Sequence, residues 1–370
     1  MKFVCNGMIL SDAATIVSKA CAVKTITPIL ECIKIQAKND GLILKAYDGE
    51  ISIEKKIVAE VLEEGEVCVN GKTFADFVGK ISSFEVVIAS DEKGVLIQYG
   101  DSESYMQVLS AADFPVFGES ATEITEYFET KESDLKNLIS KVVFCCATDE
   151  SRPILKGCLL ETVDNKLTAT ALDGFRMACS YCDVIDGNGS IKIVCPARTL
   201  TEISRMLDGD DGLKIYAAKN LLSVEVKDTI INSRLYSGEF VRKENIYPVD
   251  FTTEVRIRRA ELIDSVERAS VLIRGDKNNL VLFDIKNGKI VITANSDMGK
   301  VEETVMAELN GKELKIAMNG KYLLDALKAL EEEETLLSFN SSVAPFTVEN
   351  LEDKRCQYLV LPVRTSNSAN

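Results

Sequence analysis

The sequence contains no histidine and no tryptophan, and only seven of its 370 residues are proline. The absence of histidine removes the commonest general base and every Ser-His or Cys-His nucleophile pair. The sequence also lacks a G-x-x-x-x-G-K-[ST] phosphate loop and a glycine-rich dinucleotide turn. The residues therefore give no support for an enzyme.

Long hydrophobic runs are absent as well. No stretch approaches the roughly 18 uninterrupted apolar residues that a membrane-spanning helix needs. The first residues carry a single lysine, and Asn6-Gly7 interrupts their apolar run, which does not fit a signal peptide. We therefore expect no contact with a membrane.

Cysteine, by contrast, is plentiful, with eleven residues. Cys179 and Cys182 form the only C-x-x-C pair, and neither a second pair nor a histidine completes a zinc site. We expect buried, reduced cysteines that behave as small apolar residues, a cytoplasmic location and no cofactor.

Acidic residues outnumber basic ones by 58 to 43, which gives a net charge of −15. An even distribution of that charge would argue against binding to nucleic acid. Six windows with helical periodicity, however, together carry +5 over 84 residues, so the remaining 286 residues carry −20. These helices predict a cationic surface on an acidic body, although lysines that merely line solvated helix faces would give the same count.

One unit of the sequence occurs three times. A strand runs into a helix at Asn70, Pro196 and Asn319, which lie 126 and 123 residues apart and suit a helix start. Helical segments at 10–23, 133–144 and 260–273 open the three units, and β-patterned runs fill the rest. We predict three homologous domains, 1–120, 125–247 and 250–370, each an α+β fold with two helices on a mainly antiparallel sheet.

The stretch from Lys166 to Cys182 predicts a β-hairpin. Residues alternate between apolar and polar up to Leu172, and Asp173-Gly174 is a typical two-residue hairpin connection. Leu172, Phe175 and Met177 then surround Arg176, so the tip combines apolar side chains with a cation. An ordinary hairpin whose Phe and Met belong to the core is the alternative.

Basic residues occupy three predicted helix starts, at Lys72, Arg198 and Lys321. A helix N-terminus favours negative charge, so helix stability does not explain them, whereas an external anion does. The sequence has no base-reading motif, and contact with nucleic acid would be made to phosphates without sequence preference.

Several motifs together resemble the bacterial β sliding clamp, the processivity subunit of DNA polymerase III. They cover essentially the whole chain and are Lys2-Phe3, Thr27–Leu30, Ser110–Pro115, Ala171–Ala178, Arg205–Gly209 and Tyr358–Arg364. The D-G-x-R-x-A hairpin combined with the terminal P-x-R is the most specific pair.

The resemblance implies a DNA clamp fold and a head-to-tail homodimer that closes into a ring around duplex DNA. Such a protein is non-catalytic. It tethers the DNA polymerase III alpha subunit, other polymerases and repair proteins that carry clamp-binding peptides, and a clamp loader opens it.

The resemblance also implies two sets of site residues. The partner-peptide pocket would comprise Leu155, Leu172, Gly174, Phe175, Arg176, Met177, Val241, Ile246, Leu359, Leu361, Pro362, Val363 and Arg364. Phe175 and Val241 depart from the histidine and proline that are frequent in the family. The DNA contacts would lie at Lys24, Lys72, Arg152 and Arg198, and the helix-start argument adds Lys321.

Three repeats leave an unpaired sheet edge at each end, and such edges invite pairing. We expect Tyr105 and Met106 on one side, and Leu272 and Ile273 beside Arg274 on the other, to meet in the dimer. The competing hypothesis is a cytosolic repeat scaffold that binds proteins and never touches DNA. The acidic balance favours the scaffold, and the basic helix starts oppose it.

Overall fold

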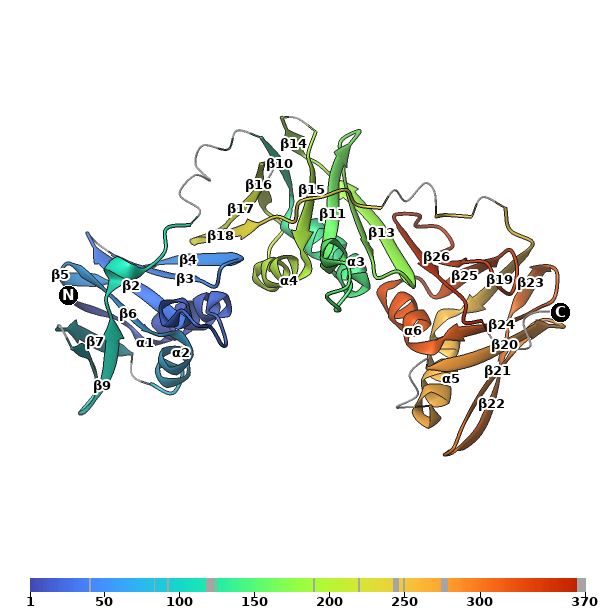
Figure 1. Ribbon diagram of the computed structural model, residues 1–370, viewed down its shortest axis with the longest axis horizontal. Helices are drawn as coiled ribbons and strands as arrows, with labels where there is room; N and C mark the ends of the chain where they lie inside the picture. Colours follow the sequence, from blue (N-terminus) through green and yellow to red (C-terminus); the bar gives the residue numbers. More distant parts are fainter. Residues whose placement is uncertain are drawn as a thin grey trace. The chain divides into compact units, whose positions relative to one another are not determined.

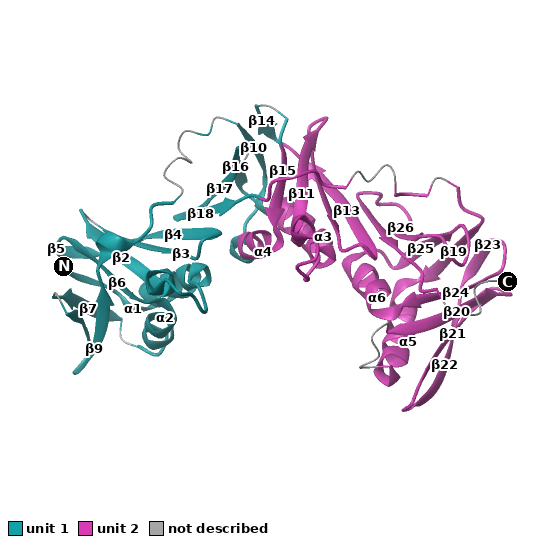
Figure 2. Cartoon of the chain, in the orientation of Figure 1, with its two compact units in different colours: residues 1–132, 185–191, 205–235 teal, residues 133–184, 192–204, 236–370 magenta. Residues whose placement is uncertain are grey.

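The computed structural model describes residues 1–39, 41–82, 84–91, 93–117, 124, 126–188, 190–218, 220–241, 246–248, 250–273 and 279–364. Parts of the stretches between the three predicted domains, and Arg274, lie outside these residues. The chain divides into two compact units, shown in Figure 2. Unit 1 comprises residues 1–132, 185–191 and 205–235, and unit 2 comprises residues 133–184, 192–204 and 236–370.

Unit 1 is built on a single sheet (Figure 1). The strand order, among the residues described, is β14-β10-β16-β17-β18-β4-β3-β2-β6-β9-β8-β7-β1-β5. Helix α1 packs against β3 and β4, and α2 packs against α1, β2 and β6. The elements are β1 Lys2–Asn6, α1 Gly7–Val17, η1 Ser18–Ala20, η2 Pro28–Glu31, β2 Cys32–Lys38, β3 Gly41–Tyr47, β4 Ile51–Val58, β5 Glu60–Glu63, β6 Gly65–Asn70, α2 Gly71–Val78, β7 Glu85–Ser90, β8 Gly94–Tyr99, β9 Ser102–Leu109, η3 Ala111–Asp113, β10 Tyr127–Lys131, β14 Asp186–Gly187, β16 Gly212–Ala218, β17 Leu221–Val226 and β18 Thr229–Arg234.

Unit 2 contains two sheets within its described residues, of order β15-β11-β12-β13-β27-β26-β25-β19-β23 and β22-β21-β20-β24. Helix α6 packs against α5, β26 and β27. Most of α3 and α4 also belongs to this unit. The elements are α3 Glu132–Val142, η5 Val143–Cys145, η6 Pro153–Lys156, β11 Gly157–Val163, β12 Lys166–Leu172, β13 Arg176–Asp183, β15 Lys192–Pro196, α4 Ala197–Met206, β19 Thr253–Arg258, α5 Arg259–Leu272, β20 Leu280–Lys286, β21 Lys289–Ser296, β22 Gly299–Met306, β23 Glu308–Gly311, β24 Leu314–Asn319, α6 Gly320–Ala329, β25 Glu334–Phe339, β26 Phe346–Asn350 and β27 Cys356–Val360.

Side-chain caps fix the start of several helices. The Asn70 carboxamide oxygen accepts from the Thr73 amide at 3.0 Å, and Asn319 accepts from Lys321 and Tyr322 at 3.0 and 3.3 Å. Asn6 caps α1 in the same way, accepting from the amide of Met8 at 2.9 Å. These bonds satisfy amides that have no partner inside the helix. The predicted junctions at residues 70, 196 and 319 are therefore confirmed as the residues that precede α2, α4 and α6.

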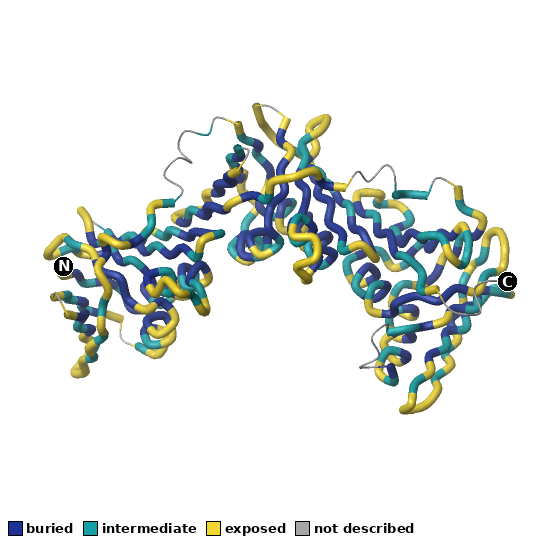
Figure 3. Tube along the Cα trace, viewed as in Figure 1, coloured by how far each residue is buried: buried dark blue, intermediate teal, exposed yellow. Residues whose placement is uncertain are grey.

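Buried positions run along the middles of the strands, and exposed ones gather at turns and strand ends (Figure 3). Ten cysteines are buried, and Cys179 is half-buried, as the sequence predicts. Among the described residues, no helix is long and apolar enough to span a bilayer.

Candidate functional site

The predicted hairpin forms, but its turn lies one residue later than predicted. Strands β12 and β13 pair up to Leu172 opposite Met177, and the Asp173 amide donates to the Arg176 carbonyl at 3.3 Å. Gly174 and Phe175 are therefore the two central residues. Gly174 has φ +93°, the left-handed region that glycine enters without strain. The Asp173 carboxylate accepts from the amides of Phe175 and Arg176 at 2.9 and 3.0 Å and so fixes the turn.

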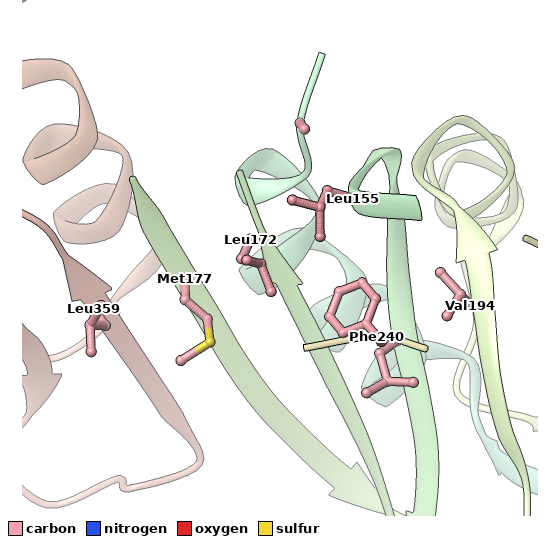
Figure 4. Close-up of a cluster of buried hydrophobic side chains, with 8 residues drawn as sticks. Leu155, Leu172, Met177, Val194, Phe240 and Leu359 are labelled. Carbon is pink, nitrogen blue, oxygen red and sulfur yellow. The ribbon is translucent and has the colours of Figure 1, made fainter. Parts of the chain in front are cut away.

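Beneath the hairpin, apolar side chains from five strands, η6 and two loops pack together. We call this group the hairpin cluster; it consists of Ala147, Leu155, Leu159, Leu172, Met177, Val194, Phe240 and Leu359. Figure 4 shows the Phe240 ring among Leu155, Leu172 and Val194. No member is more than 9% exposed, and Ile154, Tyr236, Ile246 and Tyr247 pack against the group. The structure thus brings Leu155, Leu172, Met177 and Leu359 together, as predicted, and each of them is at most 6% exposed.

The remaining predicted pocket residues lie nearer the surface. Phe175 is 60% exposed and Val241 is 38% exposed, whereas Ile246 is half-buried. After β27, the backbone passes beside the turn, because the Leu361 amide donates to the Phe175 carbonyl at 2.8 Å. Leu361, Pro362 and Val363 are half-buried, and Gly174 and Arg364 are exposed. We call Gly174, Phe175, Val241, Ile246 and residues 361–364 the rim.

Arg176 was predicted as a pocket residue, but it is buried and does not contribute to the rim. Its side chain is 8% exposed and donates to Asp173 at 3.0 Å, to Asp325 at 2.6 Å and to the Phe144 carbonyl at 2.8 Å. The guanidinium also lies over the Tyr322 ring, 4.5 Å from its centroid. A buried cation needs such partners, since each unpaired N–H would lose its hydration. Arg176 thus joins the hairpin to α6.

Tyr322 extends this junction to the surface. Its ring stacks on Phe175 with centroids 6.4 Å apart and planes 25° apart. Burial raises the pKa of the Tyr322 hydroxyl, and the Asp173 charge adds to the shift. The hydroxyl therefore stays neutral at physiological pH, and the exposed Phe175 ring has an uncharged, rigid support.

The predicted basic residues at the helix starts are exposed. Lys72, Arg198 and Lys321 each occupy the first turn of α2, α4 or α6. Lys24 and Arg152 are likewise exposed and precede η2 and η6. Lys321 has an intrahelical partner in Asp325, with Nζ 3.0 Å from the carboxylate, yet remains 61% exposed.

Other basic residues that count toward the helical charge are neutralised by acids of unit 2. Lys141 has a 7% exposed side chain and pairs with Glu331 at 3.3 Å. Arg268 donates two bonds to Glu303, at 2.9 and 2.7 Å, and Lys328 pairs with Glu267 at 2.6 Å. The count of +5 therefore overstates the charge available to an anion, because Glu331 and Glu303, which neutralise Lys141 and Arg268, lie outside the counted windows.

The residues predicted for a dimer contact differ in exposure. Tyr105 on β9 is 54% exposed, and Met106 and Leu272 are half-buried. Ile273 is only 1% exposed, because it follows the last turn of α5 into the core of unit 2. It is not a surface residue, so the expectation fails for this position; Val271, two residues earlier, is 61% exposed.

The sequence-based reasoning missed Phe144, Phe240, Tyr322 and Asp325. Phe240 could have been found from the sequence, since it is the apolar residue next to Val241, a predicted pocket residue. Asp325 lies one helical turn after Lys321, but nothing in the sequence links it to Arg176, which is 149 positions away.

Three family models match the chain in succession. Residues 1–118 match the N-terminal domain of the DNA polymerase III beta subunit, residues 129–241 its central domain, and residues 244–364 its C-terminal domain. Together they cover nearly all of the sequence.

Full-length relatives and solved structures agree with these matches. The beta sliding clamp of Bacillus subtilis is 32% identical over 381 residues, covering 99% of this chain and 100% of the relative. That of Staphylococcus epidermidis is 31% identical over 359 residues, covering 94% and 95%. The crystal structure of the Bacillus subtilis clamp superposes with a TM-score of 0.93 at 32% identity and covers 99% of both chains. The chain belongs to the DNA polymerase III beta subunit family, the non-catalytic bacterial sliding clamps.

Proposed function

We propose that two copies of this chain form a ring of six similar domains that encircles duplex DNA in the cytoplasm and tethers its partners there. Each chain would supply the three domains 1–120, 125–247 and 250–370. The observation that carries the proposal is the succession of three beta-subunit domain matches along one chain, at nearly the same borders. The three repeats in the sequence support it independently.

The ring would close through edge strands. Residues 102–107 of β9 pair with β8 on one side, and β22 pairs with β21 alone within the described part of the chain. An unpaired edge offers a row of free N–H and C=O groups, and head-to-tail pairing of two copies removes both edges. Tyr105, Met106, Leu272 and Val271 are the apolar candidates beside these edges.

Light scattering at micromolar concentration and low salt tests the assembly. A mass of twice 40.7 kDa is expected. A monomer under these conditions contradicts the ring.

DNA would be held by phosphate contacts alone. Lys24, Lys72, Arg152, Arg198 and Lys321 are exposed cations at or near helix starts, where the backbone dipole also attracts anions. Such contacts carry no sequence information, so binding to linear duplex should be weak and indifferent to sequence.

Charge reversal tests this assignment. Changing Lys72, Arg198 and Lys321 together to Glu should slow loading onto circular DNA while leaving the dimer intact. The matched control is Lys192→Glu, an exposed lysine of β15 that already pairs with Glu161 at 2.6 Å. Unchanged loading by the triple variant, or equal loss in the control, counts against the assignment.

Partners would bind across the rim, with the hairpin cluster as its floor. The exposed Phe175 and Val241 side chains and the extended backbone of residues 361–364 suit a short extended peptide that ends in an apolar-aromatic pair, with a glutamine upstream. An aromatic anchor in such a site often contributes about 2 kcal/mol or more. The partners would be the DNA polymerase III alpha subunit, other polymerases, the clamp loader and repair proteins.

Calorimetry with a Gln-x-x-Leu-Phe peptide tests the rim. Val241→Asp should weaken binding at least tenfold, because it places a charge where the peptide would desolvate it. Val163→Asp is the control, since Val163 is 56% exposed at the opposite end of the β11–β12 hairpin. Equal affinities of the two variants contradict the rim assignment.

A further inference from the structure

The junction between the hairpin and α6 contains one carboxylate that serves two cations. Asp325 accepts from Arg176 Nη1 at 2.6 Å and from Lys321 Nζ at 3.0 Å, both on the same oxygen, Oδ2. The two cations differ in exposure, since the side chain of Arg176 is 8% exposed and that of Lys321 is 61% exposed. Lys321 can therefore leave Asp325 for an external anion, whereas Arg176 cannot.

Arg176 also links Asp325 to the rim. Its amide and its guanidinium both donate to the Asp173 carboxylate, and this carboxylate also accepts from the Phe175 amide at 2.9 Å. On the α6 side, Tyr322 lies under the guanidinium and stacks on Phe175. The hairpin tip is thus held on α6 by Arg176 and its ring contacts, and the Arg176–Asp325 ion pair is their strongest link.

We propose that Asp325 is a positioning residue that couples the first turn of α6 to the partner-binding rim. This inference rests on the proposed function and deepens it. A DNA phosphate at Lys321 draws the ammonium group away from Asp325. The full carboxylate charge then acts on Arg176, which holds the Phe175 turn more firmly, so the rim loses less freedom when a peptide binds.

The expected change in peptide affinity follows from the strength of the Lys321–Asp325 ion pair, which a DNA phosphate would replace. An exposed ion pair spaced i, i+4 on a helix is weak, so duplex DNA should tighten peptide binding by about two-fold. Linkage is reciprocal, so the peptide should tighten DNA binding by the same factor.

The experiment measures the anisotropy of a labelled Gln-x-x-Leu-Phe peptide, titrated with the full-length protein at low salt, with and without saturating short duplex DNA. The parent should bind about two-fold more tightly with DNA. Lys321→Gln should bind the peptide at the tighter affinity without DNA and show no further gain. Asp325→Asn keeps the Lys321 charge and hence DNA binding, but should bind peptide more weakly and lose the DNA effect.

Lys328→Gln is the matched control, because Lys328 lies on the same helix and pairs with Glu267 instead. It should keep the two-fold gain. A merely structural Asp325 would lower peptide affinity in Asp325→Asn while leaving the ratio with and without DNA unchanged, and that result overturns the coupling. Equal peptide affinity of the parent with and without DNA also overturns it, while the proposed function stands. Failure of the parent to bind the peptide at all overturns both.

Discussion

Replacement of Arg176 by Met tests whether this residue holds the hairpin on α6. The change keeps an unbranched apolar side chain but leaves Asp173 without its cation and Asp325 with Lys321 alone. Breaking a buried ion pair from one side costs about 3–5 kcal/mol. The Asp325 and Asp173 side chains are 27% and 14% exposed, so water compensates part of the loss. We expect a local cost of about 2–3 kcal/mol.

Hydrogen exchange read by mass spectrometry measures this cost where it occurs. A cost of that size should speed exchange of amides near the hairpin turn by about 30- to 150-fold, with little change in unit 1. Arg355→Met is the matched control: its pair with Asp353 is 53% exposed on the arginine side, so its loss should cost less than about 1 kcal/mol. Equal exchange rates in the two variants would refute the assigned role of Arg176.

Three further predictions concern unit 2. Met177→Asp in the hairpin cluster, or deletion of residues 361–364 in the rim, should abolish binding of the Gln-x-x-Leu-Phe peptide in calorimetry while light scattering still finds the dimer; affinity equal to the parent's would contradict the proposed peptide site. Cys179 should be alkylated first in the native protein, because burial raises the pKa of thiols such as that of Cys146 to about 12 and keeps them protonated; early labelling of Cys146 in mass spectra would contradict this. The backbone amides of residues 351–353, chiefly that of Asp353, donate to the Glu332 carboxylate and lower its pKa. The ionised carboxylate therefore stabilises the fold at any pH above the unfolded pKa, and this contribution is lost as the pH falls through the folded pKa. Glu332→Gln should therefore be less stable than the parent in urea at pH 7, with a stability gap that narrows only as the pH falls below the unfolded Glu pKa of about 4.3; a constant gap would contradict the assigned cause.

Local sequence signals predicted the parts of the structure that depend on neighbouring residues. The junctions at Asn70 and Asn319 followed from capping chemistry, which acts within three residues. The hairpin followed from alternation and from Gly174, whose positive φ few other residues adopt. The turn was predicted one residue too early, because Asp173 is the first residue of the turn and not one of its two central residues.

Properties set by distant partners could not be predicted. Arg176 was expected at the surface, since a cation at a hairpin tip is normally solvated; its burial depends on Asp325 and Phe144, which reach it through the packing of α6 and η5. Ile273 was expected to be exposed beside Arg274, but the end of α5 turns it inward. The charge count likewise treated Arg268 as available to an external anion, although its side chain donates to Glu303 of β22.

Retention on circular DNA tests the proposed ring most directly. The protein is loaded onto nicked circular duplex by a bacterial clamp loader with ATP and separated from free protein by gel filtration. Half of the sample is then cut once with a restriction enzyme. The account predicts that the protein elutes with the intact circles and is released from the linear product, at equal DNA mass and salt. Equal retention on circular and linear DNA, or no retention on either, would contradict it.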